Sequence, residues 1–167
     1  MKKDRSVILL AVYSFPYQDP AQPEQNRIQD LLSRMTLEEK FAQMRMIPQI
    51  DHLLAGRPFS AEKVCDELKY GIGASYSPDY ISPDILNAFQ SYLLNETRLG
   101  IPLIMMGESL HGVMSPEATV FPQAIGLGAT FNAPLIAEMT GIIGREARAL
   151  GITQTYAPNL DLSRDPR

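Results

Sequence analysis

Short apolar runs alternate with amphipathic helical segments along this chain, and this alternation constrains the fold more than any other feature. Residues 71–75, 103–106 and 153–157 have the length and composition of strands and are too short for buried helices. Between them lie two longer helical segments, near residues 83–100 and 132–151. Strands that alternate with such helices predict an α/β fold with a parallel sheet, because parallel neighbours need a long crossover connection.

Residues that start and stop helices bound these segments. Ser82 followed by Pro83 is an N-cap with proline at the first helical position, and Asn132 is a second N-cap. Gly151 is expected to end the later helix. The apolar positions recur at helical spacing, at Ile85, Leu86, Phe89, Tyr92 and Leu93 and at Leu135, Ile136, Met139, Ile142, Ile143 and Leu150.

Further helices are predicted before residue 71. Thr36 and Glu39 form a capping box, in which each side chain accepts from the other residue's amide, so one helix ends and another begins there. Ser60 is expected to cap a short helix that carries Val64 and Leu68. The apolar positions around the joint are Ile28, Leu31, Leu32, Met35, Leu37, Phe41 and Met44.

Composition argues against several classes of function. The chain has 167 residues, a formal net charge of −4 and no block of like charges, so neither nucleic acid nor a membrane is an expected partner. A single cysteine, Cys65, excludes an internal disulfide. His52 and His111 do not stand in a metal-ligand spacing, and no glycine pair completes a nucleotide-binding fingerprint, so no cofactor is expected.

Residues 1–25 are expected to form an arm that precedes the domain. Residues 16–25 contain three prolines and no apolar period, which is typical of an extended linker or a wrapping arm. Residues 1–5 are basic and residues 7–12 are apolar, as in a secretory signal, although Asp4 and the lack of a clear cleavage site argue against one. A periplasmic or secreted location and a cytoplasmic one therefore both remain open.

Polar groups follow two of the predicted strands. The stretch GESLHG, residues 107–112, comes directly after the run at 103–106, and the polar residues 159–167 follow the strand at 153–157. Because ligands bind at the carboxyl ends of parallel strands, these groups are expected to share one pocket.

Each candidate group also has a plainer interpretation. Glu108 is either a ligand-binding carboxylate or a solvated loop acid or helix cap. His111, beside Gly112, either serves the pocket or only hydrogen-bonds backbone in a tight turn. Arg164 either binds a ligand or pairs with Asp165 to fix its loop.

Six blocks, in order, resemble the N-terminal domain of family 3 glycoside hydrolases. They are Arg34–Lys40 (RMTLEEK), Arg98–Pro102 (RLGIP), Glu108–Val113 (ESLHGV), Ala118–Pro122 (ATVFP), Ala129–Asn132 (ATFN) and Asp161–Arg167 (DLSRDPR). One such block would be weak support, whereas six in the family's order are specific. The resemblance covers nearly all of the chain after the arm.

The resemblance implies a (β/α)8 barrel, of which residues 26–167 would be the front portion, with about three β/α units and N-terminal helices. It implies exo-acting, retaining hydrolysis of β-linked glucose or xylose, with a β-linked oligosaccharide or glycoside as substrate. Glu108 matches a residue that grips hydroxyls of the non-reducing sugar, and Arg164 matches a second sugar-binding position. His111 resembles a residue that supports the loop carrying Glu108.

The chain also departs from the family. The family's nucleophile and acid/base lie beyond the block that ends at Arg167, and a barrel typically needs about 250 residues. The chain is therefore expected to be an incomplete barrel, to be inactive alone, and to self-associate through exposed sheet edges. The alternatives are a non-catalytic sugar-binding or interaction module, and a generic α/β enzyme that uses Glu108 and His111 as acid and base.

Overall fold

The computed structural model describes residues 13–77, 81–160 and 164, and these fall into two compact units. The first unit runs up to Lys40 and the second begins at Phe41. The apolar run predicted to resemble a secretory signal lies outside the described residues. Within the described residues, none of the helices is long and apolar enough to span a membrane.

The first unit contains a 3-10 turn, η1 (Pro16–Gln18), and helix α1 (Glu24–Arg34). The predicted joint after α1 is confirmed, since α2 (Leu37–Gln43) starts at the capping box. The Thr36 amide donates to Glu39 Oε2 over 2.8 Å, and the Glu39 amide donates to Thr36 Oγ1 over 3.3 Å. These two bonds pair amides that a helix start leaves without intrahelical partners.

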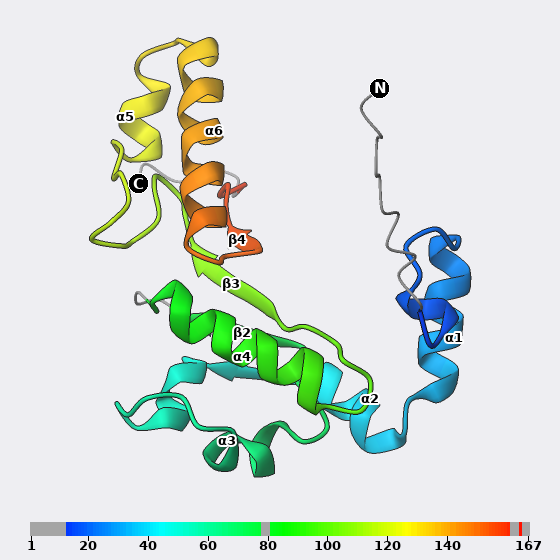
Figure 1. Cartoon of the computed structure of the whole chain (residues 1–167). Coiled ribbons are helices and arrows are strands. Elements are labelled where there is room, and N and C mark those ends of the chain that lie inside the picture. The colour runs from blue at the N-terminus through cyan, green and yellow to red at the C-terminus, as the bar shows by residue number, and fades with distance from the viewer. Residues whose placement is uncertain (1–12, 78–80, 161–163, 165–167) are drawn as a thin grey trace, which may run out of the picture. The chain divides into compact units, whose positions relative to one another are not determined.

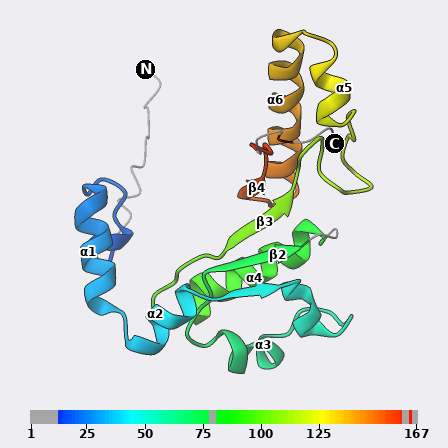
Figure 2. The same ribbon diagram turned by 180° about the vertical axis from the view of Figure 1, so that it is seen from behind.

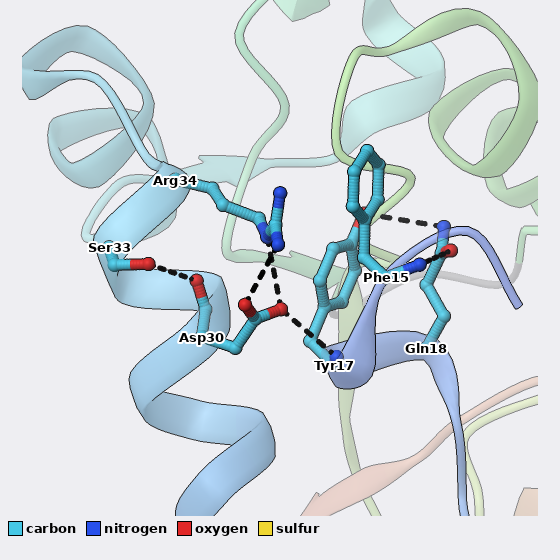
Figure 3. A network of polar contacts seen from close by, with 6 residues as sticks. All are labelled: Phe15, Tyr17, Gln18, Asp30, Ser33 and Arg34. Atoms are coloured by element: carbon cyan, nitrogen blue, oxygen red, sulfur yellow. Dashed lines mark hydrogen bonds and ion pairs between the residues drawn. The ribbon is translucent and has the colours of Figure 1, made fainter.

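The residues before α1 fold back on that helix, as Figure 3 shows. The Tyr17 amide donates to Asp30 Oδ2 over 3.2 Å, and Arg34 Nη2 lies 2.9 Å from Asp30 Oδ1. The Arg34 guanidinium also stands 4.0 Å over the Phe15 ring, a cation–π contact. Pro16–Gln18 is therefore a folded turn against α1, which favours the wrapping arm over the extended linker for this part of residues 16–25.

The second unit is built on a four-stranded sheet with the order β1-β2-β3-β4, in which every neighbouring pair is parallel. The strands are β1 (Met46–Pro48), β2 (Ala74–Ser77), β3 (Ile104–Glu108) and β4 (Gln154–Tyr156). Strands that follow each other across the sheet in chain order are typical of a barrel. An open doubly wound sheet instead reverses its strand order at a switch point.

Helices connect consecutive strands, and Figures 1 and 2 show α4 lying across one face of the sheet. The connecting elements are η2 (Ile50–Leu54), α3 (Ala61–Leu68), α4 (Pro83–Glu96), α5 (Ala124–Gly128) and α6 (Ala133–Ala149). The predicted caps hold, since Ser82 Oγ accepts from the Ile85 amide over 3.4 Å and Asn132 Oδ1 accepts from the Leu135 amide over 3.0 Å. Ser60 precedes α3 as predicted, but its side chain makes no capping bond.

Two elements differ from the predicted ones. β1 is not among the predicted strands, because a three-residue strand that ends in Pro48 carries almost no sequence signal. The predicted strand at 71–75 begins later, at Ala74. Gly71 has φ +82° and follows α3 as its turn residue, and Gly73 lies so close to the Gln43 carbonyl that a Cβ would stand 2.0 Å from it.

The main core lies between the sheet and the helices α3 and α4. Alternate residues of β3 show which face of the sheet is covered, because Met105 is buried while Ile104 is 47% exposed. Phe89 of α4 is fully buried and meets Phe59 edge to face at 5.1 Å. The buried members of this core are Ile50, Leu54, Val64, Leu68, Ile72, Ile81, Leu86, Phe89, Tyr92, Leu93, Leu103 and Met105.

A second, smaller core ties α6 to the loop that follows β3. Its buried members are Val113, Ala147 and Leu150, with Ala118 and Ile152 packed against them. This cluster matters for function, because the loop that it anchors begins directly after Glu108.

Candidate functional site

Glu108 is the last residue of β3, at the carboxyl edge of the sheet. Its side chain is partly buried, and its Oε1 accepts a hydrogen bond of 3.1 Å from the hydroxyl of Tyr76 on the neighbouring strand β2. In the register of the sheet, Tyr76 lies opposite Met106, so it reaches Glu108 diagonally across the two strands. The predicted pocket residue is thus held by a side chain that the sequence patterns did not single out.

Two tyrosines lean together beside this carboxylate. The rings of Tyr76 and Tyr156 lie 5.2 Å apart at an angle of 68°, although β3 runs between their strands. The Tyr156 hydroxyl lies 3.5 Å from the sulfur of Met106. Met106 belongs to β3, the strand between those of the two tyrosines. The face of the sheet opposite the main core therefore carries an aromatic patch next to Glu108.

A hollow of about 590 Å³ opens over this edge of the sheet. It is lined by Glu108, Leu110, Thr155, Tyr156, Ala157, Pro158 and Asn159. Residues from the ends of β3 and β4 therefore meet in one depression, as expected for adjacent parallel strands. Glu108 is the only carboxylate among these described lining residues, and carboxylate oxygens can accept hydrogen bonds from hydroxyl groups.

His111 fixes the loop after Glu108. Its Nδ1 lies 2.8 Å from the Phe121 carbonyl oxygen, and the Phe121 amide donates to the His111 carbonyl over 2.7 Å. Gly112 has φ +128°, and a Cβ at this position would stand 2.2 Å from the Thr119 carbonyl oxygen. The loop thus closes tightly on itself through a backbone position that only glycine tolerates.

The same loop is also tied to α6. Glu146 accepts from the Thr119 amide over 2.9 Å and from the Thr119 hydroxyl over 2.8 Å. A carboxylate that accepts two hydrogen bonds from one residue restrains both the backbone and the side chain there. Together with the contacts of His111, this holds the segment that follows Glu108 against the helix.

The other residues predicted for the pocket are not among the described residues that line the hollow. Arg164 is exposed and is not among the described residues that line the hollow. Asp161 and Asp165 lie outside the described residues, so the predicted pairing of Arg164 with Asp165 does too. His111 directs one ring nitrogen to a backbone carbonyl and is likewise not among the lining residues, which argues against the acid–base pair with Glu108.

No metal site marks this region among the described residues. In the described part of the chain, no three side chains of the metal-binding types His, Cys, Asp and Glu gather into a group. The pKa of Tyr92 is raised by its burial, but this residue belongs to the main core. Among the described residues, the polar groups that line the hollow are the carboxylate of Glu108, the hydroxyls of Thr155 and Tyr156 and the side chain of Asn159.

Comparison with known sequences decides the family. The family description "Glycosyl hydrolase family 3 N terminal domain" matches residues 36–167. The chain belongs to glycosyl hydrolase family 3. Its four sequential parallel strands are accordingly part of the family's (β/α)8 barrel, and the α/β fold predicted from the sequence is confirmed.

Several proteins similar to this chain are named β-glucosidases or β-xylosidases. A periplasmic β-glucosidase of Salmonella typhimurium is 31% identical over 141 residues, which cover 84% of this chain and 17% of the relative. A β-xylosidase of Formosa agariphila is 46% identical over 70 residues, covering 39% of this chain and 10% of the relative. A β-glucosidase C of Emericella nidulans is 30% identical over 158 residues, covering 84% and 25%. The chain thus spans a quarter or less of the length of each of these relatives.

Proposed function

We propose that this chain supplies sugar-binding residues of an exo-acting, retaining β-glycosidase. Such an enzyme removes terminal glucose or xylose from β-linked glycosides. The observation that carries the proposal is the placement of Glu108. Its carboxylate stands at the carboxyl edge of the sheet, over a hollow, beside an aromatic patch. Family membership and the names of the relatives support the substrate class.

Glu108 suits the binding of a sugar better than the cleavage of one. A carboxylate accepts hydrogen bonds from two neighbouring hydroxyl groups at once, and bonds to an ionised acceptor are the stronger kind. A retaining glycosidase instead needs two carboxyl groups about 5–5.5 Å apart. Because the described lining of the hollow holds one carboxylate, we assign Glu108 to binding and positioning.

Two further residues complete the proposed sugar site. Arg164 is proposed as a second grip, since a guanidinium offers five N–H donors to sugar oxygens. His111 is proposed to act indirectly, by holding the loop that starts after Glu108 through its contact with Phe121. Binding energy from groups that do not touch the glycosidic bond, such as these, helps to align that bond for reaction.

Residues 1–167 alone are proposed to bind sugar without turning it over. The described residues contribute four strands, and a closed barrel of this type needs eight. Residues 26–167 are therefore proposed to be the front portion of the barrel, with residues 1–25 as an arm. A periplasmic or secreted location is proposed as well, because two relatives are named periplasmic enzymes.

The proposal is tested by saturation-transfer NMR of the chain with methyl β-glucoside and methyl β-xyloside, together with an assay of aryl β-glycoside hydrolysis. We expect binding in the millimolar range, weakened at least fivefold by Glu108→Gln, and no turnover. Binding that does not depend on Glu108 would contradict its proposed role as the group that binds the sugar. Turnover that survives purification and is lost in Glu108→Ala would contradict the proposed inactivity.

A further inference from the structure

We propose that Tyr76 is the positioning residue of this sugar site, acting through Glu108. This inference rests on the proposed function, since it concerns how the carboxylate is presented to a sugar. The Tyr76 hydroxyl donates to Glu108 Oε1 over 3.1 Å. Glu108 lines the hollow, whereas Tyr76 is not among the described lining residues. Tyr76 therefore reaches the sugar through Glu108 and not by direct contact.

The hydrogen bond fixes one oxygen of the carboxylate and leaves the other for the ligand. A glutamate side chain has three rotatable bonds, and without a partner it samples many rotamers at the end of a strand. The phenol uses one of about four lone-pair positions of the carboxylate. The remaining positions, including both on Oε2, can accept from a pair of sugar hydroxyls.

Tyr76 is itself held in place by a residue of β4, two strands away on the same face of the sheet. Its ring meets that of Tyr156 edge to face at 5.2 Å, and the Tyr156 hydroxyl reaches the Met106 sulfur at 3.5 Å. Tyr156 also lines the hollow. The two rings and Glu108 thus link strands β2, β3 and β4 on the face of the sheet opposite the main core, where Ile104 is 47% exposed.

Pre-ordering of Glu108 has a consequence for affinity. A sugar that meets an already oriented carboxylate does not have to restrict its rotamers on binding, which favours the complex. Hydrogen bonds to a charged group are also stronger than those between neutral groups. We therefore expect the loss of the Tyr76 hydroxyl to weaken sugar binding by about tenfold.

The experiment compares Tyr76→Phe with Tyr70→Phe in the full chain. Each substitution removes one phenol oxygen and keeps the ring, but only the first removes a bond to Glu108. Tyr70 is 46% exposed and is not among the described residues that line the hollow. The dissociation constant of methyl β-glucoside is measured by NMR titration for both variants, for Glu108→Ala, and for Tyr76→Phe in the Glu108→Ala background. We expect about tenfold weaker binding for Tyr76→Phe, less than twofold for Tyr70→Phe, and no further loss in the double variant.

A second measurement does not depend on any sugar. Side-chain ¹³C relaxation should show the Glu108 methylenes becoming mobile in Tyr76→Phe and staying ordered in the control variant Tyr70→Phe. Unchanged Glu108 order in Tyr76→Phe overturns the positioning role, and so does an equal loss of affinity with and without Glu108. If the unsubstituted chain binds no sugar, the proposed function fails, and the relaxation result alone then decides the role of Tyr76.

Discussion

Substitution of Gly112 by alanine tests whether the loop after Glu108 is as tightly closed as its geometry indicates. Gly112 has φ +128°, and a Cβ would stand 2.2 Å from the Thr119 carbonyl oxygen. The shortest ordinary C···O separations are about 3.3 Å, so the two loop segments that carry Gly112 and Thr119 must move apart by about 1 Å. The bond from the Phe121 amide to the His111 carbonyl lies in this segment and should weaken with it.

The expected loss of stability has two parts. A residue other than glycine in this region of φ costs about 1–3 kcal/mol, and displacement of closely packed backbone costs a further 1–3 kcal/mol, roughly. Gly112→Ala should therefore destabilise the chain by about 2–6 kcal/mol, a large fraction of the roughly 5–15 kcal/mol of a typical domain.

Two matched variants separate these parts. Gly56 has φ +70° with nothing within 4 Å of a Cβ, so Gly56→Ala carries only the backbone part, about 1–2 kcal/mol. Gly73→Ala carries only the close contact, since its Cβ would stand 2.0 Å from the Gln43 carbonyl oxygen. The assay is urea unfolding followed by circular dichroism, with the Phe121 amide shift as the local reporter. A Gly112→Ala variant as stable as Gly56→Ala, with an unmoved Phe121 amide, would refute the reasoning.

Three further predictions concern the core, the arm and the open face of the sheet. Phe89→Ala removes a fully buried ring and should cost about 3–5 kcal/mol in urea unfolding, whereas Phe131→Ala, at a side chain that is 95% exposed, should change little. The hydrogen bond from Arg34 lowers the pKa of Asp30 below the ordinary aspartate value. The contact between the Asp30 carboxylate and the Tyr17 amide should therefore persist at pH values above the ordinary aspartate pKa, and be lost as the pH falls below that pKa. An acid titration of the Tyr17 amide shift should show this, and Asp30→Asn should abolish it; a shift with the same titration in Asp30→Asn would count against the assignment. Ile104→Lys places a charge on the open face and should reduce the self-association that we expect for the chain in sedimentation velocity, while an unchanged association would argue that another surface is used.

Local signals in the sequence were sufficient where the physics is local. Ser82 and Asn132 start their helices, and Thr36 with Glu39 forms both bonds of the capping box, because each cap depends on a residue three positions away. Strand β1 and the start of β2 escaped prediction for the converse reason. Three residues ending in Pro48 form a strand only because Ala74 to Tyr76 lie beside them.

In the candidate site, too, the features set by neighbouring residues are predictable and those set by distant residues are not. Glu108 is predictable, because a carboxylate directly after a buried apolar run must lie at the carboxyl edge of a parallel sheet. Its contact with Tyr76 is not predictable, because the two residues are 32 positions apart in the sequence. They meet only through the register between β2 and β3. Tyr156 joins the site from β4 only through the same register. The alternation of side chains along a strand was the one available signal, since it places Tyr76 on the face opposite the buried Ser75.

Glu108 is proposed as the group that holds the sugar. The most direct measurement is a map of amide shift changes in the chain as methyl β-glucoside is added, for the unsubstituted protein and for Glu108→Gln. We predict that the changes centre on Glu108, Leu110 and Tyr156 and are largely lost in Glu108→Gln. Changes centred away from the hollow, or equal in both proteins, would contradict the account.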